Sequence, residues 1–424
     1  MMDDSHSAWI TGIGVLGPQG TGWDQLCQSL EHPAPHFSNM PESWVGHAGI
    51  PDAYIASLNE AANADAKRHE TLSTDRACAL ALAAAEQAWR QASAPSNPNT
   101  DPHRCGVFWG TGMGGLHTTE TAYNRLLVEH HALRPMTVVR IMANSAAAQL
   151  AMKYKLQGPN HTYTVACASS AMALGEALLA LRLGRIDMAL VGGSEAMLAP
   201  GVLAAWGALR VLSTRKTAPT AAEACRPFGA KRSGLVVGEG AAAFVLESPR
   251  HAKARGAKPL AELIGYGSTC DASSLVQPQL EGQVRAMRQA LDDAKLVPSQ
   301  IDTINAHATG TDAGDLVEAL AIAATFAPAS STLALPPVSA TKSMHGHLLG
   351  AAGALEAAVC IASLHKGIVP ATLGFSAESP LDPKCQMLDL AMGAPRHVAR
   401  LEHVLSNSFA FGGSNISLIF KRSA

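Results

Sequence analysis

Short runs of apolar and β-branched residues alternate along the chain with longer stretches rich in alanine and leucine. The short runs predict strands and the longer stretches predict helices. In the first half, strands are expected in residues 8–17, 104–115, 161–167 and 185–196. Helices are expected in residues 74–92, 145–156 and 168–184. This alternating order predicts a layered α/β fold.

The second half repeats this alternation. It predicts a strand at the end of 251–270, helices in 281–296 and 351–367, and a strand–turn–strand unit in 403–420. The segment 301–311 reads as a strand that enters a loop of small residues, as 104–115 does in the first half. We therefore predict an internal duplication, with one half in residues 1–254 and the other in 255–424.

Composition narrows the classes of protein that fit this pattern. Of 424 residues, 47% are hydrophobic and only 16% are charged, so much of the chain must be buried in the fold or in a subunit interface. The net charge of −2 favours neither nucleic acid nor membrane surfaces as partners. We find no signal peptide and no apolar run long enough to span a membrane, and we expect a cytoplasmic location.

The eight cysteines are dispersed and form no CxxC pair, so we expect reduced thiols and no metal site. Cys167 stands out because it lies where a predicted strand passes into a predicted helix. The positive end of a helix dipole favours a thiolate and lowers the pKa of a cysteine. A buried core thiol is the competing interpretation, and from this segment alone it is the stronger one.

Three distant loops supply other reactive groups. His307 precedes Thr309 and Thr311, and a cap on the following helix from Thr311, Asp312 or Asp315 is the plainer interpretation. Lys342, His345 and His347 share one short loop, in which a lysine would keep imidazoles neutral. The His-x-His spacing also suggests a metal site as an alternative, but no carboxylate or cysteine lies next to these histidines in the sequence. The last segment, 407–415, holds two phenylalanines before a Gly-Gly pair, which is typical of a tight turn or a gate.

One cysteine and two histidine-bearing loops fit Cys-dependent acyl transfer. A papain-like protease would also use Cys and His, but it would need neither a second histidine nor a neighbouring lysine. The segments "VACASS", "NAHATGT", "KSMHGHLLGAAG" and "NSFAFGGSN" together resemble the β-ketoacyl-ACP synthases, the condensing enzymes of fatty acid and polyketide synthesis. The type II, elongating branch is the most similar, and the likeness extends from about Thr11 to Phe420.

The resemblance implies the thiolase fold, in which two βαβαβαββ halves form five α-β-α-β-α layers. It implies a homodimer, or a heterodimer with a related subunit, that works with acyl carrier protein. No cofactor is implied beyond the phosphopantetheine that the carrier brings. The condensation joins malonyl-carrier, with loss of CO₂, to an acyl group held on the enzyme.

The resemblance also implies roles for individual residues. Cys167 is the acyl-accepting nucleophile, and His307 and His347 contact the malonyl thioester. Lys342 orders the histidines and forms a buried charged pair with Glu318, while Asp315 and Asn407 support the site. The backbone N–H groups of Cys167 and Phe411 form the oxyanion hole. The substrate is contacted by Thr309, Thr311, Met113, Phe409 and Phe411, with Phe411 as the gate and Met113 as the limit on acyl-chain length.

Two alternatives and two departures accompany this resemblance. A non-catalytic partner subunit, which sets chain length, would share the fold but usually lacks the cysteine. A CoA-dependent thiolase would carry a second cysteine in the Gly-rich segment, where "FAFGGSN" has none. Ala308 and Ala410 replace glycines of the family pattern and could alter the gate. These departures make a specialised polyketide or polyene synthase at least as good a fit as a primary fatty acid elongase.

Overall fold

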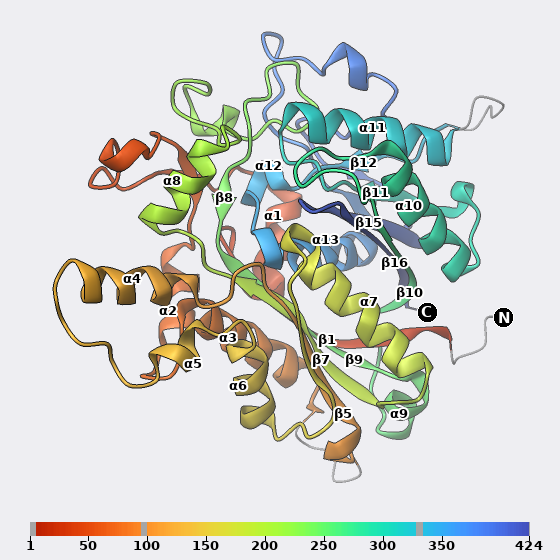
Figure 1. The fold of residues 1–424 in the computed structure, drawn as a ribbon. Coiled ribbons are helices and arrows are strands. Elements are labelled where there is room, and N and C mark those ends of the chain that lie inside the picture. Colours follow the sequence, from red (N-terminus) through yellow and green to blue (C-terminus); the bar gives the residue numbers. More distant parts are fainter. Residues whose placement is uncertain (1–5, 95–99, 328–333, 424) are drawn as a thin grey trace.

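The computed structural model describes residues 6–94, 100–327 and 334–423, so the outermost residues of the two predicted halves lie outside it. Its first half forms the strands β1 (Ala8–Gly17), β5 (Cys105–Gly110), β6 (Asn160–Tyr163), β7 (Met188–Glu195) and β9 (Gly240–Glu247) of the main sheet. The helices of this half are α1 (Trp23–Glu31), α2 (Glu60–Lys67), α3 (Arg76–Gln91), α4 (Leu116–Leu127), α5 (Thr137–Ile141), α6 (Ser145–Tyr154), α7 (Ser169–Arg182), α8 (Pro200–Ala208) and α9 (Pro249–Ala254) (Figure 1).

The second half forms a matching set of elements. Its strands in the main sheet are β10 (Ala261–Cys270), β11 (Thr303–Asn305), β12 (Val338–Ser339), β15 (His403–Phe409) and β16 (Ser414–Arg422). Its helices are α10 (Leu280–Ala294), α11 (Asp312–Phe326), α12 (Lys342–His345) and α13 (Ala352–Lys366). Short strands outside these two sets are β2 (Gly20–Thr21), β3 (Ser38–Asn39), β4 (Tyr54–Ala56), β8 (Val237–Gly238), β13 (Ile368–Val369) and β14 (Arg396–His397).

Strand pairing shows the duplication directly. The first half runs β1-β9-β7-β5-β6, with two antiparallel pairings followed by two parallel ones. The second half runs β10-β16-β15-β11-β12 with the same series of pairings. A short antiparallel contact between β1 and β10 joins the two sets into one continuous sheet. The predicted duplication is therefore visible in the topology, although the sequence similarity between the halves is weak.

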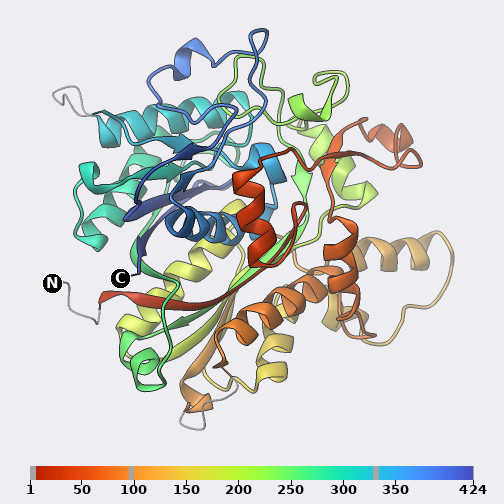
Figure 2. The ribbon, with the colours of Figure 1, turned by 180° about the vertical axis from the view of Figure 1, so that it is seen from behind.

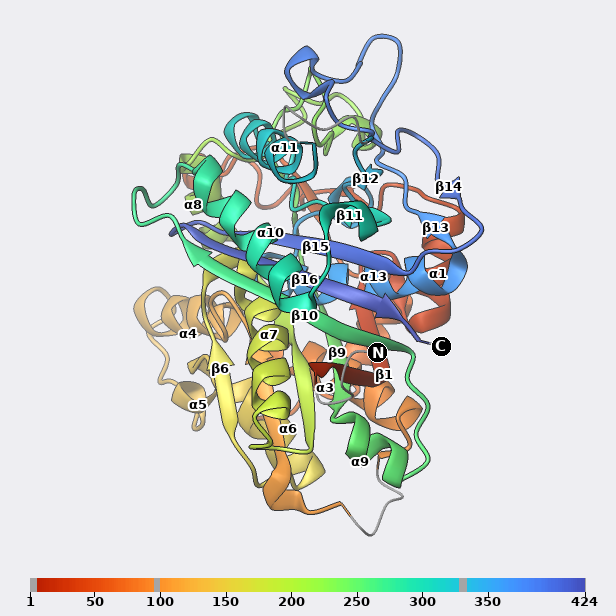
Figure 3. The same ribbon diagram turned by 90° about the vertical axis from the view of Figure 1, so that its right-hand side faces the viewer.

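The layers follow from which helices pack on which strands. Helices α3 and α6 cover the outer face of the first set of strands, and α10 and α11 cover the second set. Helices α7 and α13 pack against each other between the two sets (Figures 2 and 3). This α-β-α-β-α arrangement is the thiolase fold expected from the resemblance.

Glycines in the two central strands allow the outer helices to approach closely. A Cβ atom on Gly12 or Gly14 of β1 would lie about 2 Å from the carbonyl oxygens of Ala88 and Ala84 in α3. Gly265 and Gly267 of β10 have the same relation to α10, with Cβ positions 2.6 and 2.0 Å from the carbonyl oxygens of Ala290 and Ala286. Small residues on both sides therefore set this packing distance, which accounts for part of the alanine content.

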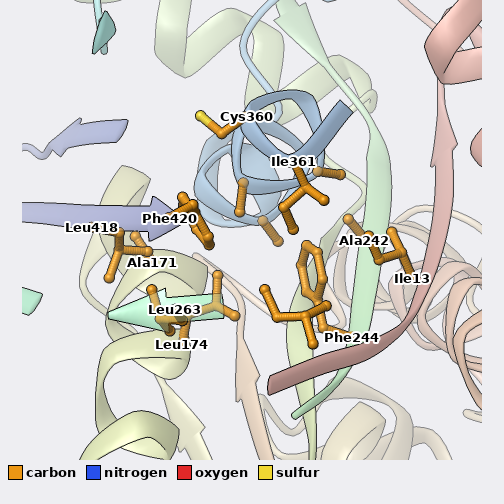
Figure 4. Packing of buried hydrophobic residues seen from close by; sticks show 14 of the residues in the cluster. Ile13, Ala171, Leu174, Ala242, Phe244, Leu263, Cys360, Ile361, Leu418 and Phe420 are labelled. Atoms are coloured by element: carbon orange, nitrogen blue, oxygen red, sulfur yellow. The ribbon is translucent and has the colours of Figure 1, made fainter. Parts of the chain in front are cut away.

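The main core surrounds the two inner helices. Helix α13 is buried from Ala352 to Leu364, and most of α7 is buried as well, as its apolar sequence predicts. Figure 4 shows side chains of β9, β10 and β16 beside α13 in this cluster. Because both inner helices begin at the same end of the sheet, their N-terminal turns are brought together there, and the candidate site lies between them.

Candidate active site

Cys167 lies on a strained turn between β6 and α7. The predicted strand 161–167 ends early, at Tyr163, and Ala166–Ala168 forms a 3-10 turn in which Ala166 has a φ of +50°. The hydroxyl of Ser169 closes the turn, since it accepts a hydrogen bond from the N–H of Val165 (3.0 Å) and donates one to the carbonyl of Ala166 (2.7 Å). This turn holds the thiol at the start of α7 with only 7% of Cys167 exposed.

Burial decides the protonation of this thiol. It raises the pKa of Cys167 to about 11, whereas Lys342 and the backbone N–H groups of Phe411 and Cys167 act to lower it. The expectation that the helix start leaves this pKa depressed is therefore wrong, because loss of solvation outweighs the favourable charges. The same two N–H groups nonetheless converge on the sulfur, as the predicted oxyanion hole requires.

Two neutral histidines from the second half face the sulfur. The Nε2 atom of His347 lies 3.0 Å from Sγ of Cys167, and the rings of His307 and His347 meet edge to face at 5.3 Å. Burial lowers the pKa of both histidines well below 6.5, and the charge of Lys342 lowers it further. The prediction that Lys342 keeps His345 and His347 neutral agrees in direction, since the pKa of each is lowered, but burial is a larger cause than the lysine.

Fixed donors set the tautomer of each ring. The N–H of Leu349 donates to Nδ1 of His347 at 3.3 Å, and the ammonium of Lys342 lies 3.4 Å from Nδ1 of His307. A neutral imidazole whose Nδ1 accepts a hydrogen bond carries its proton on Nε2. Both histidines therefore present N–H donors, which suit a developing oxyanion.

This protonation also bears on the metal alternative. One ring nitrogen of each histidine and the sulfur of Cys167 lie within 4.8 Å of one another, which is compact enough for an ion. A metal ligand must offer a lone pair, however, and both Nδ1 lone pairs are already engaged. The chemistry of these donors therefore favours an anion over a cation between them.

The ion pair of Lys342 differs from the expectation. Its ammonium is fully buried and pairs with the equally buried carboxylate of Glu356 on α13, not with Glu318. Glu318 instead accepts the backbone N–H groups of His307 (2.8 Å) and Ala308 (2.7 Å). The predicted pair is wrong because α11 directs Glu318 beneath the His307 loop, while α13 brings Glu356 to the lysine.

The other supporting residues act through hydrogen bonds to this loop. Asp315 is buried and accepts the N–H groups of Thr309 (3.0 Å), Gly310 (3.1 Å) and Phe228 (2.7 Å). Asn407 donates to Glu318 at 3.2 Å. Together with Glu318 they hold His307 at the end of β11.

A cavity of about 430 Å³ opens onto the sulfur. Cys167, both histidines, Thr309, Thr311, Phe409 and Phe411 line it. The hydroxyls of Thr309 and Thr311 lie 3.0 Å apart on its wall. Phe411 is partly exposed and stacks on Trp206 of α8, with ring centroids 6.0 Å apart. The cavity is therefore lined by the apolar rings of Phe411 and Trp206 on one side and by the hydroxyls of Thr309 and Thr311 on another.

Met113 does not line this cavity. It lies in the turn after β5, and 54% of its surface is exposed within this chain.

Neither Ala308 nor Ala410 has a positive φ, so the replacement of glycine strains neither position. Gly412 and Gly413 supply the left-handed residues of the turn.

Sequence reasoning missed Glu356, Glu195 and Trp206. The two glutamates carried a usable signal, since each stands alone in an apolar run, "AAGALEAAVC" and "MALVGGSEA". A charge in such a run is buried and needs a partner. Trp206 gave no such signal, because its place beside Phe411 depends on how α8 folds back over the site.

Comparisons with known proteins agree with this geometry. Residues 7–252 match the family model "Beta-ketoacyl synthase, N-terminal domain", and residues 260–376 match "Beta-ketoacyl synthase, C-terminal domain". The chain is 38% identical to nodulation protein E of Rhizobium leguminosarum bv. trifolii over 97% of this chain and 98% of that protein. It is 36% identical to 3-oxoacyl-[acyl-carrier-protein] synthase 2 of Staphylococcus aureus (strain COL), over 99% of both chains.

Two solved structures give the same picture. A β-ketoacyl synthase from Burkholderia phymatum STM815 superposes with a TM-score of 0.88 and 36% identity, over 99% of this chain and 100% of that chain. A type II PKS acyl-carrier protein in complex with its ketosynthase bound to the hexaketide gives a TM-score of 0.88 and 27% identity over the same shares.

Proposed function

The chain belongs to the β-ketoacyl synthase family, and from this premise we propose how its residues divide the work of elongating a fatty acid or polyketide. The observation that carries the proposal is the 3.0 Å contact between the Cys167 sulfur and Nε2 of His347, with His307 beside it. A nucleophile faced by two N–H donors fits an acyl transfer followed by a condensation that passes through an enolate.

In the first step, Cys167 takes the acyl group from a carrier-protein thioester. Its sulfur forms a bond to the acyl carbon, the bond to the carrier sulfur breaks, and the thiol proton leaves with the carrier as a free thiol. The backbone N–H groups of Cys167 and Phe411 hold the oxygen of the tetrahedral intermediate. Exchange of one thioester for another is nearly balanced in energy. A thiol with a pKa of about 11 therefore needs only the stabilisation of its thiolate that Lys342 and the two backbone N–H groups provide.

In the second step, malonyl-carrier loses CO₂ and leaves an enolate. The Nε2–H groups of His307 and His347 donate to the enolate oxygen, which removes much of the cost of a charge in this apolar site. The enolate carbon then attacks the acyl carbon on Cys167, the C–S bond breaks, and the released sulfur takes up one proton. Loss of one such donor typically slows a reaction about 100- to 1000-fold.

Access to the sulfur is controlled by the residues that line the cavity. The phosphopantetheine arm of the carrier hydrogen-bonds to Thr309 and Thr311, and no cofactor of the enzyme's own is required. Phe409 and Phe411 shield the acyl group, and the stacking of Phe411 on Trp206 keeps water away from it between the two steps.

The partner of this chain is a second ketosynthase-like chain, either a copy or a relative. Supporting this, the segment from α4 to α5 exposes large apolar side chains, with Leu127 and Val128 each 68% and Val138 71% exposed. In such a dimer Met113, which lies in the turn just before α4, would close the acyl pocket. Sedimentation of the purified chain alone and with Val138→Asp tests this, and a wild-type monomer that no related subunit binds would contradict it.

We also place the enzyme in the cytoplasm, because all eight cysteines are free thiols. No helix among the described residues is long and apolar enough to cross a membrane.

Mass spectrometry after incubation with acyl-carrier protein tests the central assignment. We expect one acyl adduct per chain, which Cys167→Ala abolishes and Cys270→Ser, at an exposed cysteine, leaves unchanged. An adduct on another cysteine would refute the assignment. A folded wild-type chain that takes no acyl group would instead support the non-catalytic, chain-length-setting role.

A further inference from the structure

Glu195 is a buried carboxylate that the proposed reaction does not use. It is the last residue of β7 and has no exposed surface. One oxygen accepts the backbone N–H groups of Gly112 (2.5 Å) and Gly350 (3.1 Å), and the other lies 3.4 Å from the hydroxyl of Thr111. Among the described residues, no cationic side chain lies within ion-pair distance of it. Backbone donors therefore take the place of a counter-ion.

The two turns that Glu195 joins come from different halves of the chain. Gly112 follows β5 in the first half, and Gly350 begins the approach to α13 in the second. A Cβ on Gly350 would lie 2.5 Å from Glu195 Oε2 and 2.2 Å from the N atom of Gly112, and a Cβ on Gly112 would lie 2.7 Å from the same oxygen. The turns therefore touch directly, and the carboxyl group fits between them only because both residues are glycine.

The turn at Gly350 also controls a catalytic group. Its preceding residue, Leu349, has a φ of +49° and donates its N–H to Nδ1 of His347. A non-glycine residue in this region is held there by its surroundings. The hydrogen bond from Gly350 to Glu195 is one such restraint, and it lies one residue from the donor that fixes the His347 tautomer.

We propose that Glu195 is a positioning residue for the condensation: it locks the Gly350 turn onto the Gly112 turn and thereby holds the Nε2–H of His347 toward Cys167. The proposal rests on the roles proposed above for Cys167 and His347. It also joins the turn that carries Met113 to the catalytic histidine, because the backbone N–H of Met113 is a further donor to Glu195.

The role needs an acceptor and not a charge. Burial raises the pKa of Glu195 to about 7, against the opposing effect of its backbone donors, so the neutral carboxyl is accessible near neutral pH. A glutamine can place its carbonyl oxygen where Oε2 now lies and direct its NH₂ toward Thr111, whose hydroxyl can accept. A leucine has similar bulk and no acceptor, so it would leave the backbone N–H groups that now donate to Glu195 without a partner.

The test compares Glu195→Leu and Glu195→Gln in malonyl-carrier decarboxylation on the acylated enzyme. We expect Glu195→Leu to lower kcat about 100-fold with little change in KM, as a small misplacement of a catalytic group does. Glu195→Gln should restore kcat to within about threefold of wild type, because the acceptor is kept. The matched control is Glu247→Gln, at a buried glutamate on the adjacent strand β9 that pairs with Arg255, and it should leave kcat unchanged.

A second measurement reads the position of His347 without substrate. The ¹⁵N shifts of labelled histidines should show the Nε2–H tautomer at His347 in wild type and in Glu195→Gln, and a mixture of tautomers in Glu195→Leu. The proposal fails if Glu195→Leu keeps its kcat or its tautomer, or if Glu195→Gln loses as much activity as Glu195→Leu. If the leucine variant does not fold, the glutamine variant still decides, because loss of its tautomer or of its activity refutes the role. Failure of the reaction itself would appear separately, as a wild-type chain that neither acylates nor decarboxylates.

Discussion

Two turns of nearly the same shape begin the two inner helices, and only one of them carries a cysteine. Ala166–Ala168 precedes α7 and Leu349–Ala351 precedes α13, each as a 3-10 turn whose first residue has a φ of +50° or +49°. Their middle residues are Cys167 and Gly350. In the first turn Cys167 lines the cavity. In the second turn the N–H of Gly350 donates a hydrogen bond to Glu195.

The duplicated fold supplies two equivalent turns, and their different residues give them different roles. One turn holds the sulfur beside two backbone donors. The other turn became a support, since its Leu349 fixes the tautomer of His347 and its Gly350 is packed against the Gly112 turn. Both histidines come from the second half, so the reaction proposed for Cys167 draws on residues of both halves.

The largest effect expected from breaking this division is the loss of a histidine. His307→Ala and His347→Ala should each slow malonyl decarboxylation about 100- to 1000-fold, because a donor to the enolate is removed. Acyl transfer to Cys167 should fall much less, since its oxyanion is held by backbone N–H groups. Separate assays of CO₂ release and of the acyl adduct measure the two steps. Equal losses in both steps would contradict the proposed roles.

The same histidines predict the pH dependence of decarboxylation. Their pKa values lie well below 6.5 in the folded chain, through burial and then Lys342. The donors therefore stay neutral, and titration of these histidines should cause no fall in rate as pH is lowered through 6.5. A ring of His307 or His347 that titrates near 6.5 by NMR would contradict this, whereas a loss of rate near pH 7 would report the buried carboxyl groups of Glu318 and Glu356, whose pKa values burial raises to about 7.

A smaller effect is expected from adding one carbon to the second turn. In Gly350→Ala the new Cβ would lie 2.2 Å from the backbone N of Gly112, so backbone must move, at a cost of about 3 kcal/mol in the free energy of unfolding. The control is Gly201→Ala in α8, whose Cβ would meet only the end of the Glu120 side chain at 3.0 Å. Denaturant unfolding of both variants measures this, and equal midpoints would show that the two turns are not pressed together.

The smallest effect comes from relieving the strain that the turns share. Ala166→Gly should raise the free energy of unfolding by up to about 1 kcal/mol, because glycine adopts a positive φ without strain. Leu349→Gly relieves the same φ but deletes a side chain that is only 2% exposed, and should cost about 2 kcal/mol or more. Thermal or denaturant melts compare the two. A destabilised Ala166→Gly would show that the first turn carries no backbone strain.

Much of the fold followed from patterns along the chain. The segment 168–184 is apolar on nearly all sides, which predicts a buried helix, and α7 is enclosed between the two sets of strands. The order of strands and helices in each half indicated the duplication. The strand predicted to end at Cys167 ends four residues earlier, at Tyr163, because the chain turns from the strand into the helix between Thr164 and Cys167.

By itself the sequence determined which residues are available for the chemistry, since a cysteine and three loops with histidines, a lysine and glycines carry the family resemblance. Only the tertiary structure decided how they pair. It gave Lys342 the carboxylate of Glu356 and left Glu318 to the His307 loop, because α11 and α13 approach from different sides. It also set the pKa of Cys167 to about 11, since loss of solvation depends on everything packed around the sulfur and not on its neighbours in sequence.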